Sequence, residues 1–174
     1  MSFILYTKGN FVLEYVDSDK LNHLCFQIGK KIDKDIEPLK FIIRTNLSSD
    51  KLMARDFVLG DILDVVSENV KDLLAKYFPS EVQFLTAKIV DKNNNEIEGF
   101  YVMNILNKIE CLDMEKSIYD LYWKKVVPSD GEMLGKLNIV RSAESKDVVV
   151  SKYFKEVVTK NKIKNVEFLK ERTF

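Results

Sequence analysis

VSENVKDLLAKYFPSEVQFL, from Val66 to Leu85, and VSKYFKEVVTKNKIKNVEFL, from Val150 to Leu169, are two versions of one pattern. They align without a gap over 20 residues and are identical at seven positions. A helix of about 12 residues is marginal alone and needs a sheet against which to bury its apolar side. The repeat therefore predicts two equivalent structural units on shared or adjacent sheets, and by itself it predicts no catalysis.

In the first copy, Ser67 stands before apolar residues at positions i, i+3, i+4 and i+7, the spacing of a helix with one buried side. These residues are Val70, Leu73, Leu74 and Tyr77. A serine at this place accepts a hydrogen bond from a free N–H group of the first turn, so Ser67 is the predicted N-cap. Pro79 ends the helix, and the strand EVQFLTAKIVD follows it.

The second copy follows the same logic, with Ser151 as the predicted N-cap. The buried side is expected to hold Phe154, Val157 and Val158. Lys155 and Lys160 are expected on the solvent side, and NVEFL forms the next strand. A short strand precedes each serine, DILDVVS in the first copy and KDVVVS in the second. Each unit is therefore predicted as strand, capped helix and strand.

The remaining chain adds mostly strands. EVQFLTAKIVD and EIEGFYVMNIL are predicted to form a hairpin around Asn93–Asn95, because asparagine tolerates left-handed backbone angles. Residues 3–6 and 11–16 read as strands around a turn at Gly9 and Asn10, and LKFIIRT as another strand. The segment KLNHLCFQIGKKIDKD has helical spacing but remains ambiguous, and NLSSDKLMARD is a polar connector with room for a helical turn.

The predicted fold class is α+β, with mixed or antiparallel sheets. It contains two equivalent strand–helix–strand units at about residues 56–90 and 139–170, and a central hairpin. The length of 174 residues fits one domain or two small lobes that share a core, and we predict a single domain, residues 1–174. Within it we expect a strand-rich N-terminal subregion, 1–50, and a region with the repeat, 55–174.

Composition argues against several classes of protein. Hydrophobic residues make up 46% and charged residues 31%, the net charge is zero, and lysines outnumber arginines 23 to four. Nucleic-acid binding is disfavoured, because it favours excess positive charge and arginine forks. No run of 18 apolar residues predicts a membrane span, and the N-terminus has no basic signal region, so we expect a cytoplasmic protein. Cys25 and Cys111 have no ligand-like spacing and are expected to be free thiols.

No motif for a catalytic centre, a cofactor or a metal is present. His23 is the only histidine, the glycines stand singly, and no nucleophile elbow or phosphate-binding loop occurs. The segment DKNNNEIEG has the look of a calcium loop but has no glycine at position 6 and no glutamate at position 12, so it is predicted as a turn.

Two features point to a binding surface. Residues 50–72 carry six acidic and three basic side chains, while the tail from Arg141 to Phe174 has net charge +4. Either both are solvated faces, or one matches a partner protein through Asp61, Asp64 and Glu68. The segment CLDMEKSIYDLYWKK holds Tyr119, Tyr122 and Trp123, which either fill a core edge or anchor an interface.

With these segments located, the chain resembles bacterial immunity protein family 11 of polymorphic toxin systems, formerly a domain of unknown function. Four segments carry the resemblance, in the order DFVLGDILDVVSENVKDLLAKYFPSEVQFLTAKI, GFYVMNILNKIECLDMEKSIY, LNIVRSAESKDVVVSKYFKEVV and NVEFL. It covers about residues 55–174, and the first 50 residues match loosely. The chain departs from the family at Lys152, where glutamate is usual, and in the loop KKVVPSDGEMLGK.

The resemblance implies a non-catalytic protein that binds a cognate toxin and covers its active site, with no cofactor. It marks Asn104, Asn107, Asp113, Ser117 and Tyr119 as family positions without an established role. Asp113 is a candidate for partner binding. In the competing interpretation, Asp113 and Ser117 form hydrogen bonds with backbone groups of a turn or a helix start.

Two rival functions stay open. A small hydrolase or transferase would use paired carboxylates in a pocket with tyrosine or asparagine nearby. An adaptor module of phage or mobile-element origin would share the non-catalytic build.

Overall fold

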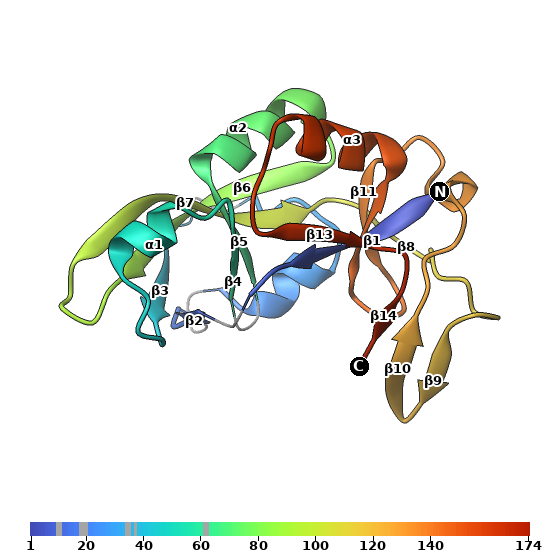
Figure 1. Cartoon of the computed structure of the whole chain (residues 1–174), viewed down its shortest axis with the longest axis horizontal. Helices are drawn as coiled ribbons and strands as arrows, with labels where there is room; N and C mark the ends of the chain where they lie inside the picture. The colour runs from blue at the N-terminus through green and yellow to red at the C-terminus, as the bar shows by residue number, and fades with distance from the viewer. Residues whose placement is uncertain (10–11, 18–20, 34–35, 37, 61–62) are drawn as a thin grey trace.

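The structure is a computed structural model that describes residues 1–9, 12–17, 21–33, 36, 38–60 and 63–174. In this part of the chain the strands form three sheets of six, five and three strands, and two longer helices lie together over one side of the larger sheets (Figure 1). The predicted α+β class with mixed and antiparallel sheets is confirmed.

The six-stranded sheet has the order β2-β3-β6-β7-β5-β4 and is antiparallel except between β3 and β6. Its strands are β2 (Leu13–Tyr15), β3 (Leu39–Ile43), β4 (Phe57–Leu59), β5 (Asp64–Ser67), β6 (Val82–Val90) and β7 (Glu96–Ile105). The five-stranded sheet has the order β13-β1-β12-β11-β8, with only β11 and β8 parallel. Its strands are β1 (Ser2–Thr7), β8 (Lys108–Ile109), β11 (Ile139–Ser142), β12 (Val148–Ser151) and β13 (Val166–Leu169).

The third sheet, in the order β14-β10-β9, is a small antiparallel extension. Its strands are β9 (Ile118–Asp120), β10 (Tyr122–Val126) and β14 (Arg172–Thr173). The helical elements of the described chain are α1 (Ser49–Met53), α2 (Glu68–Tyr77), α3 (Lys152–Lys160) and the 3-10 helices His23–Gln27 and Gly131–Leu134.

Helix α2 begins and ends close to the predicted places. The Ser67 hydroxyl accepts a hydrogen bond from the Val70 N–H group at 3.4 Å, and Val70 and Leu74 are fully buried. The prediction for Tyr77 is wrong: its side chain is 40% exposed, and Phe78 is buried instead. The reason is that the helix ends at Tyr77, so the chain turns at Phe78 and directs that ring toward the core.

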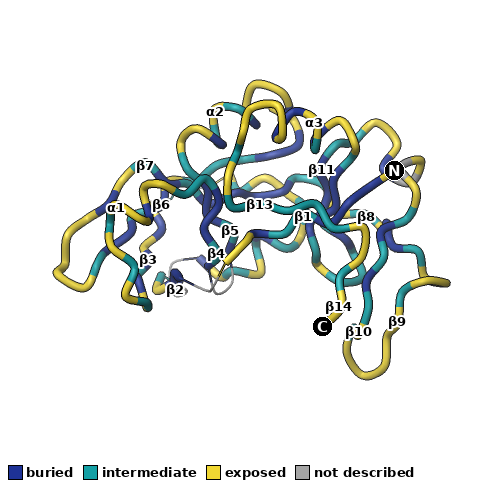
Figure 2. Tube along the Cα trace, viewed as in Figure 1, coloured by how far each residue is buried: buried dark blue, intermediate teal, exposed yellow. Residues whose placement is uncertain are grey.

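Helix α3 repeats this arrangement. The Ser151 hydroxyl accepts from the Phe154 N–H group at 3.1 Å. The three residues predicted for its buried side, Phe154, Val157 and Val158, are buried. Figure 2 shows the outer side of both helices exposed. Lys155 departs from the expected solvent position, because its chain is half-buried and its Nζ atom lies 4.1 Å from the centre of the Phe3 ring.

The N-terminal strand completes the second unit. In the first unit β7 lies between β5 and β6, and in the second unit β1 lies between β12 and β13, each time antiparallel to both neighbours. The correspondence extends to side chains. Lys71 of α2 lies 4.4 Å over the Tyr101 ring of β7, as Lys155 of α3 lies over Phe3 of β1. This cation–π contact gives a physical reason for a lysine at both positions of the repeat.

The two units also bind each other at their helix caps. The Ser67 hydroxyl donates to Asp56 at 3.0 Å, and the Ser151 hydroxyl donates to Asn138 at 2.9 Å. Asp56 also accepts from the Lys164 N–H group of the second unit at 2.8 Å. In return, buried Glu81 of the first unit accepts from the Asn138 N–H group at 2.6 Å. The residue that supports each cap, Asp56 or Asn138, is therefore also hydrogen-bonded to the other unit.

We predict that Ser67→Ala and Ser151→Ala each lower the free energy of unfolding by about 1 kcal/mol, because each removes an N-cap bond. Urea denaturation measures the change. Ser80→Ala is the control, since Ser80 is an exposed serine in the turn after α2. Equal stability of all three variants would contradict the assigned caps.

The N-terminal strands are present, but they belong to different sheets: β1 joins the five-stranded and β2 the six-stranded sheet. Asn10 of the predicted turn lies outside the described residues. The ambiguous segment forms the 3-10 helix at His23–Gln27, and the polar connector holds α1. The predicted hairpin of β6 and β7 is confirmed, with Asn94 at φ 64° in its turn. Asp91 accepts from the Asn93 and Asn95 N–H groups at 2.8 and 2.9 Å, as a turn requires.

Two main cores result. One lies within the six-stranded sheet. The two edges of this sheet meet, because the Val12 N–H group donates to the Leu59 carbonyl at 3.0 Å and Leu13 forms an isolated parallel β-bridge with Gly60. A Cβ atom at Gly60 would stand 2.4 Å from the Leu63 oxygen, so the chain needs glycine there. The other core lies beneath α2 and α3 and draws on both units. Within the described residues, none of the helices has the length and apolar character to cross a bilayer.

Candidate partner-binding surface

The hairpin of β9 and β10 extends from one end of the molecule (Figure 1). Its tip is Leu121, which lies between the paired residues Asp120 and Tyr122 and has a φ of 56°. Left-handed backbone costs a residue with a Cβ atom about 1–2 kcal/mol. Leu121 is also 89% exposed. A strained, apolar residue at an exposed tip does not serve stability, and strain of this kind gathers at functional sites.

The aromatic residues of the hairpin differ in burial, which bears on the two interpretations left open by the sequence. Tyr119 and Tyr122 are 62% and 64% exposed, so neither fills a core edge. Trp123 is half-buried and packs against the small cluster of Ile4, Leu112 and Val126. Its ring meets that of Tyr119 edge-on at 5.1 Å. Trp123 thus joins an exposed aromatic surface to the body of the protein. We call Tyr119, Leu121, Tyr122 and Trp123 the aromatic hairpin surface.

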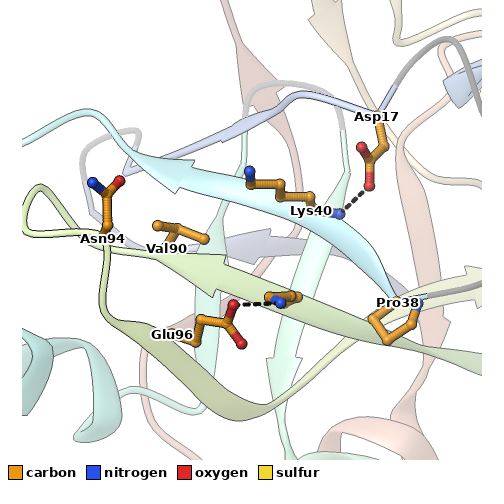
Figure 3. Close-up of a pocket in the computed structure, with 7 residues that line it drawn as sticks. Asp17, Pro38, Lys40, Val90, Asn94 and Glu96 are labelled. Carbon is orange, nitrogen blue, oxygen red and sulfur yellow. Dashed lines mark hydrogen bonds and ion pairs between the residues drawn. The ribbon is translucent and has the colours of Figure 1, made fainter.

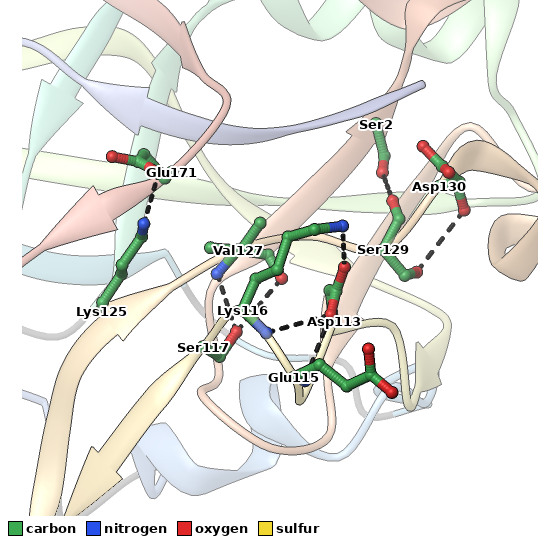
Figure 4. Close-up of polar contacts among 10 residues, drawn as sticks. All are labelled: Ser2, Asp113, Glu115, Lys116, Ser117, Lys125, Val127, Ser129, Asp130 and Glu171. Atoms are coloured by element: carbon green, nitrogen blue, oxygen red, sulfur yellow. Dashed lines mark hydrogen bonds and ion pairs between the residues drawn. The ribbon is translucent and has the colours of Figure 1, made fainter.

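The base of the hairpin is fixed by polar contacts (Figure 4). Asp113 accepts from the Glu115 and Lys116 N–H groups at 3.2 and 3.1 Å. The hydroxyl of Ser117 accepts from the Val127 N–H group at 3.0 Å. Hydrogen bonds from Lys116 hold the pKa of the Asp113 carboxyl below its ordinary value. Asp113 and Ser117 therefore make the backbone contacts that the internal interpretation predicts.

The charges of the hairpin are paired within the chain. Lys116 pairs with Asp113 at 2.5 Å, Lys124 with Asp120 at 2.7 Å, and Lys125 with Glu171 at 2.8 Å. Exposed pairs of this kind contribute little stability. They leave a surface dominated by apolar and aromatic groups rather than by one sign of charge.

The acidic candidates lie elsewhere. Glu68 is on α2, where it accepts from the Tyr101 hydroxyl at 3.2 Å and from Lys71 at 3.3 Å. Asp64 lines a cavity between the two units with Arg141 and Asp147. Burial raises the pKa of the Asp64 carboxyl, an effect that Arg141 opposes. Asp61 lies outside the described residues. The acidic run therefore does not join the aromatic residues in one surface.

The two asparagines marked by the resemblance have internal contacts. Asn104 is fully buried, and its Nδ2 atom donates to the Lys30 carbonyl at 2.9 Å and to Gln83 at 3.0 Å. The Asn107 carbonyl accepts from the Arg141 N–H group at 2.8 Å. Both residues hold loops against strands.

A pocket of about 400 Å³ contains the residue types that a carboxylate enzyme would use (Figure 3). It is lined by Asp17, Pro38, Lys40, Lys88, Val90, Asn94 and Glu96. Asp17 accepts from the Lys40 N–H group at 2.7 Å, and Glu96 is paired with Lys88. Each of the two carboxylates is thus bound to its own partner. The two are not paired with each other, as the carboxylates of a general acid and a general base would be.

The two cysteine thiols are among the remaining reactive groups that the sequence singled out. Cys25 and Cys111 are free thiols, as predicted. Burial raises the pKa of the Cys111 thiol to about 12, so it stays protonated. The described residues contain no group of three or more histidine, cysteine, aspartate or glutamate side chains that could hold a metal ion.

Exposed tyrosine side chains gathered on one hairpin, beside a half-buried tryptophan, are typical of surfaces that bind other proteins. Comparison with known proteins gives the family. The model of the immunity protein family (Imm11) matches residues 29–173, and the chain belongs to this family. The match confirms the predicted resemblance and begins earlier in the chain than the segments that carried it. No curated protein matches the chain. Membership implies an immunity-type, non-catalytic role with a toxin as partner.

Proposed function

We propose that this protein binds a cognate bacterial toxin in the cytoplasm and neutralises it by covering the toxin's active site, as part of a polymorphic toxin system. The observation that carries the proposal is the aromatic hairpin surface, together with membership of the immunity protein family. The proposed partner is a protein, and we propose no binding to nucleic acid or to a membrane.

The hairpin has the properties of an interface centre. Tyrosine and tryptophan carry much of the binding energy of protein interfaces, because they bury large areas and have few rotatable bonds. The contacts of Asp113 and Ser117 hold the hairpin in place before binding, so little conformational entropy is lost on association. The exposed Leu121 at the tip gives the surface a narrow apolar end, which suits a concave site such as an enzyme cleft.

We predict that Tyr119→Ala and Tyr122→Ala each weaken toxin binding about 30-fold, the ratio given by about 2 kcal/mol at an interface hot spot. Calorimetry with a catalytically inactive form of the cognate toxin, sought among the products of the neighbouring genes, measures the affinity. A growth-rescue assay with the active toxin measures neutralisation.

Tyr77→Ala is the matched control, because Tyr77 is an exposed tyrosine on α2, away from the hairpin. It is expected to leave affinity and rescue unchanged. A wild-type protein that neither binds nor rescues would refute the proposed function. Wild-type binding that survives both hairpin substitutions would refute the contact surface alone.

A further inference from the structure

A second surface lies between the start of β1 and the exposed side of α3. It is a groove of about 490 Å³. We call it the α3 groove, and its lining includes Met1, Phe3, Lys152, Lys155, Glu156 and Lys160. The Phe3 ring, under the Lys155 ammonium group, and the exposed Met1 side chain supply apolar surface. Lysine stems add to this surface while their charged ends reach water.

The charges around the α3 groove are uneven. Glu156 is the acidic residue of α3, and it stands 3.7 Å from Lys152. Just beyond the helix, Lys162 and Lys164 add two further positive charges. Among the described residues, the side chains of Lys160, Lys162 and Lys164 have no ion pair.

The first unit provides an internal comparison. In α2, Glu68 occupies the position of Lys152, and Lys76 that of Lys160. There the acidic residues Glu68 and Asp72 both lie within 3.3 Å of Lys71, so the charges are balanced locally. Since the same strand–helix–strand framework forms with glutamate in place of Lys152, the fold does not require the positive surface of α3. The excess charge is therefore available for binding.

We propose that the α3 groove binds an acidic segment of the toxin that carries an apolar side chain. This inference rests on the proposed function and adds a second contact to it. The lysines would attract the acidic segment and speed encounter, while the apolar floor would accept its side chain. The start of β1, α3 and the β9–β10 hairpin lie in the same half of the molecule in Figure 1.

A protein segment fits this groove better than a nucleic acid does. The described residues that line the groove include lysines and no arginine, so they offer no planar forks for phosphate or guanine. Its floor is apolar and its flanks are charged, whereas a phosphate backbone calls for a continuous basic track.

The test compares charge reversals on the two helices of the repeat, where Lys160 of α3 corresponds to Lys76 of α2. The variant Lys152→Glu/Lys160→Glu is expected to slow association with the inactive toxin about tenfold at about 0.1 M salt. The difference from wild type should largely vanish at about 1 M salt, where the Debye length falls from ~10 to ~3 Å. Lys76→Glu on α2 is the control and is expected to leave the association rate within about twofold of wild type. Thermal melting confirms that each variant is folded.

The outcomes separate the two proposals. No binding and no rescue by the wild-type protein would overturn both. Normal binding by Lys152→Glu/Lys160→Glu would overturn the α3 groove and leave the proposed function intact. An equal slowing by Lys76→Glu would show a general effect of net charge and would also overturn the groove. So would binding of a short DNA duplex with the same dependence on Lys152 and Lys160.

Discussion

Phe154→Ala is expected to lower the free energy of unfolding by about 3–5 kcal/mol, the cost of removing a large ring from a packed core. Phe154 is fully buried and stacks on Phe78 with ring centres 5.0 Å apart. It also meets Phe168 of β13 at 6.4 Å. Because Phe78 follows α2 and Phe168 belongs to the second unit, the cavity would open where the two units meet. Domains of this size are stable by only about 5–15 kcal/mol.

Tyr153→Ala is the matched control. Tyr153 is the neighbouring aromatic residue on the same helix, but its side chain is 51% exposed and touches Phe78 only edge-on at 5.9 Å. We expect a loss below about 1 kcal/mol, as for most surface substitutions. Urea denaturation of the two variants gives the comparison. Equal losses would mean that α3 does not bury the side assigned to it.

Ile4→Asp is expected to abolish cooperative folding. Ile4 is fully buried in β1, paired with Val149 on one side and Leu169 on the other. A carboxylate there would have no partner, and a buried unpaired charge costs several kcal/mol. Because Ile4 belongs to the cluster on which Trp123 rests, the aromatic hairpin surface should lose its support as well.

Ile4→Val separates charge from shape in this test. It removes one methyl group and is expected to cost about 0.5–1.5 kcal/mol with a normal unfolding transition. Circular dichroism and denaturant titration follow both variants. A cooperatively folded Ile4→Asp protein with near wild-type stability would show that β1 is not an interior strand.

Much of the scaffold could be predicted because its signals are local. A serine followed by apolar residues at helical spacing identified both caps and most of both buried sides, and the Asn93–Asn95 turn identified the central hairpin. The failure at Tyr77 came from a shift of one residue at a helix end, where the chain leaves helical geometry and periodicity no longer applies.

The remaining features depend on distant residues. The sequence shows β1 as a strand, but its place between β12 and β13 depends on strands near the other end of the chain. The bonds of Glu81 to Asn138 join residues that no local pattern connects. The aromatic residues 119–123 were consistent with a core or a surface position. Side chains alternate between the two faces of a strand, and this alternation does not identify a buried face when both faces of a hairpin are open to solvent. Likewise, the contact of Glu68 with Tyr101 and the position of Asp64 beside Arg141 depend on residues distant in sequence.

The position of β1 also sets the order in which the chain can mature. Ser2 pairs with Ser151, so β1 leaves the ribosome long before its neighbours β12 and β13 have been made. At ~5–20 residues per second, this delay is about 7–30 s. During that interval an apolar strand stays open to chaperones, and the second strand–helix–strand unit stays incomplete.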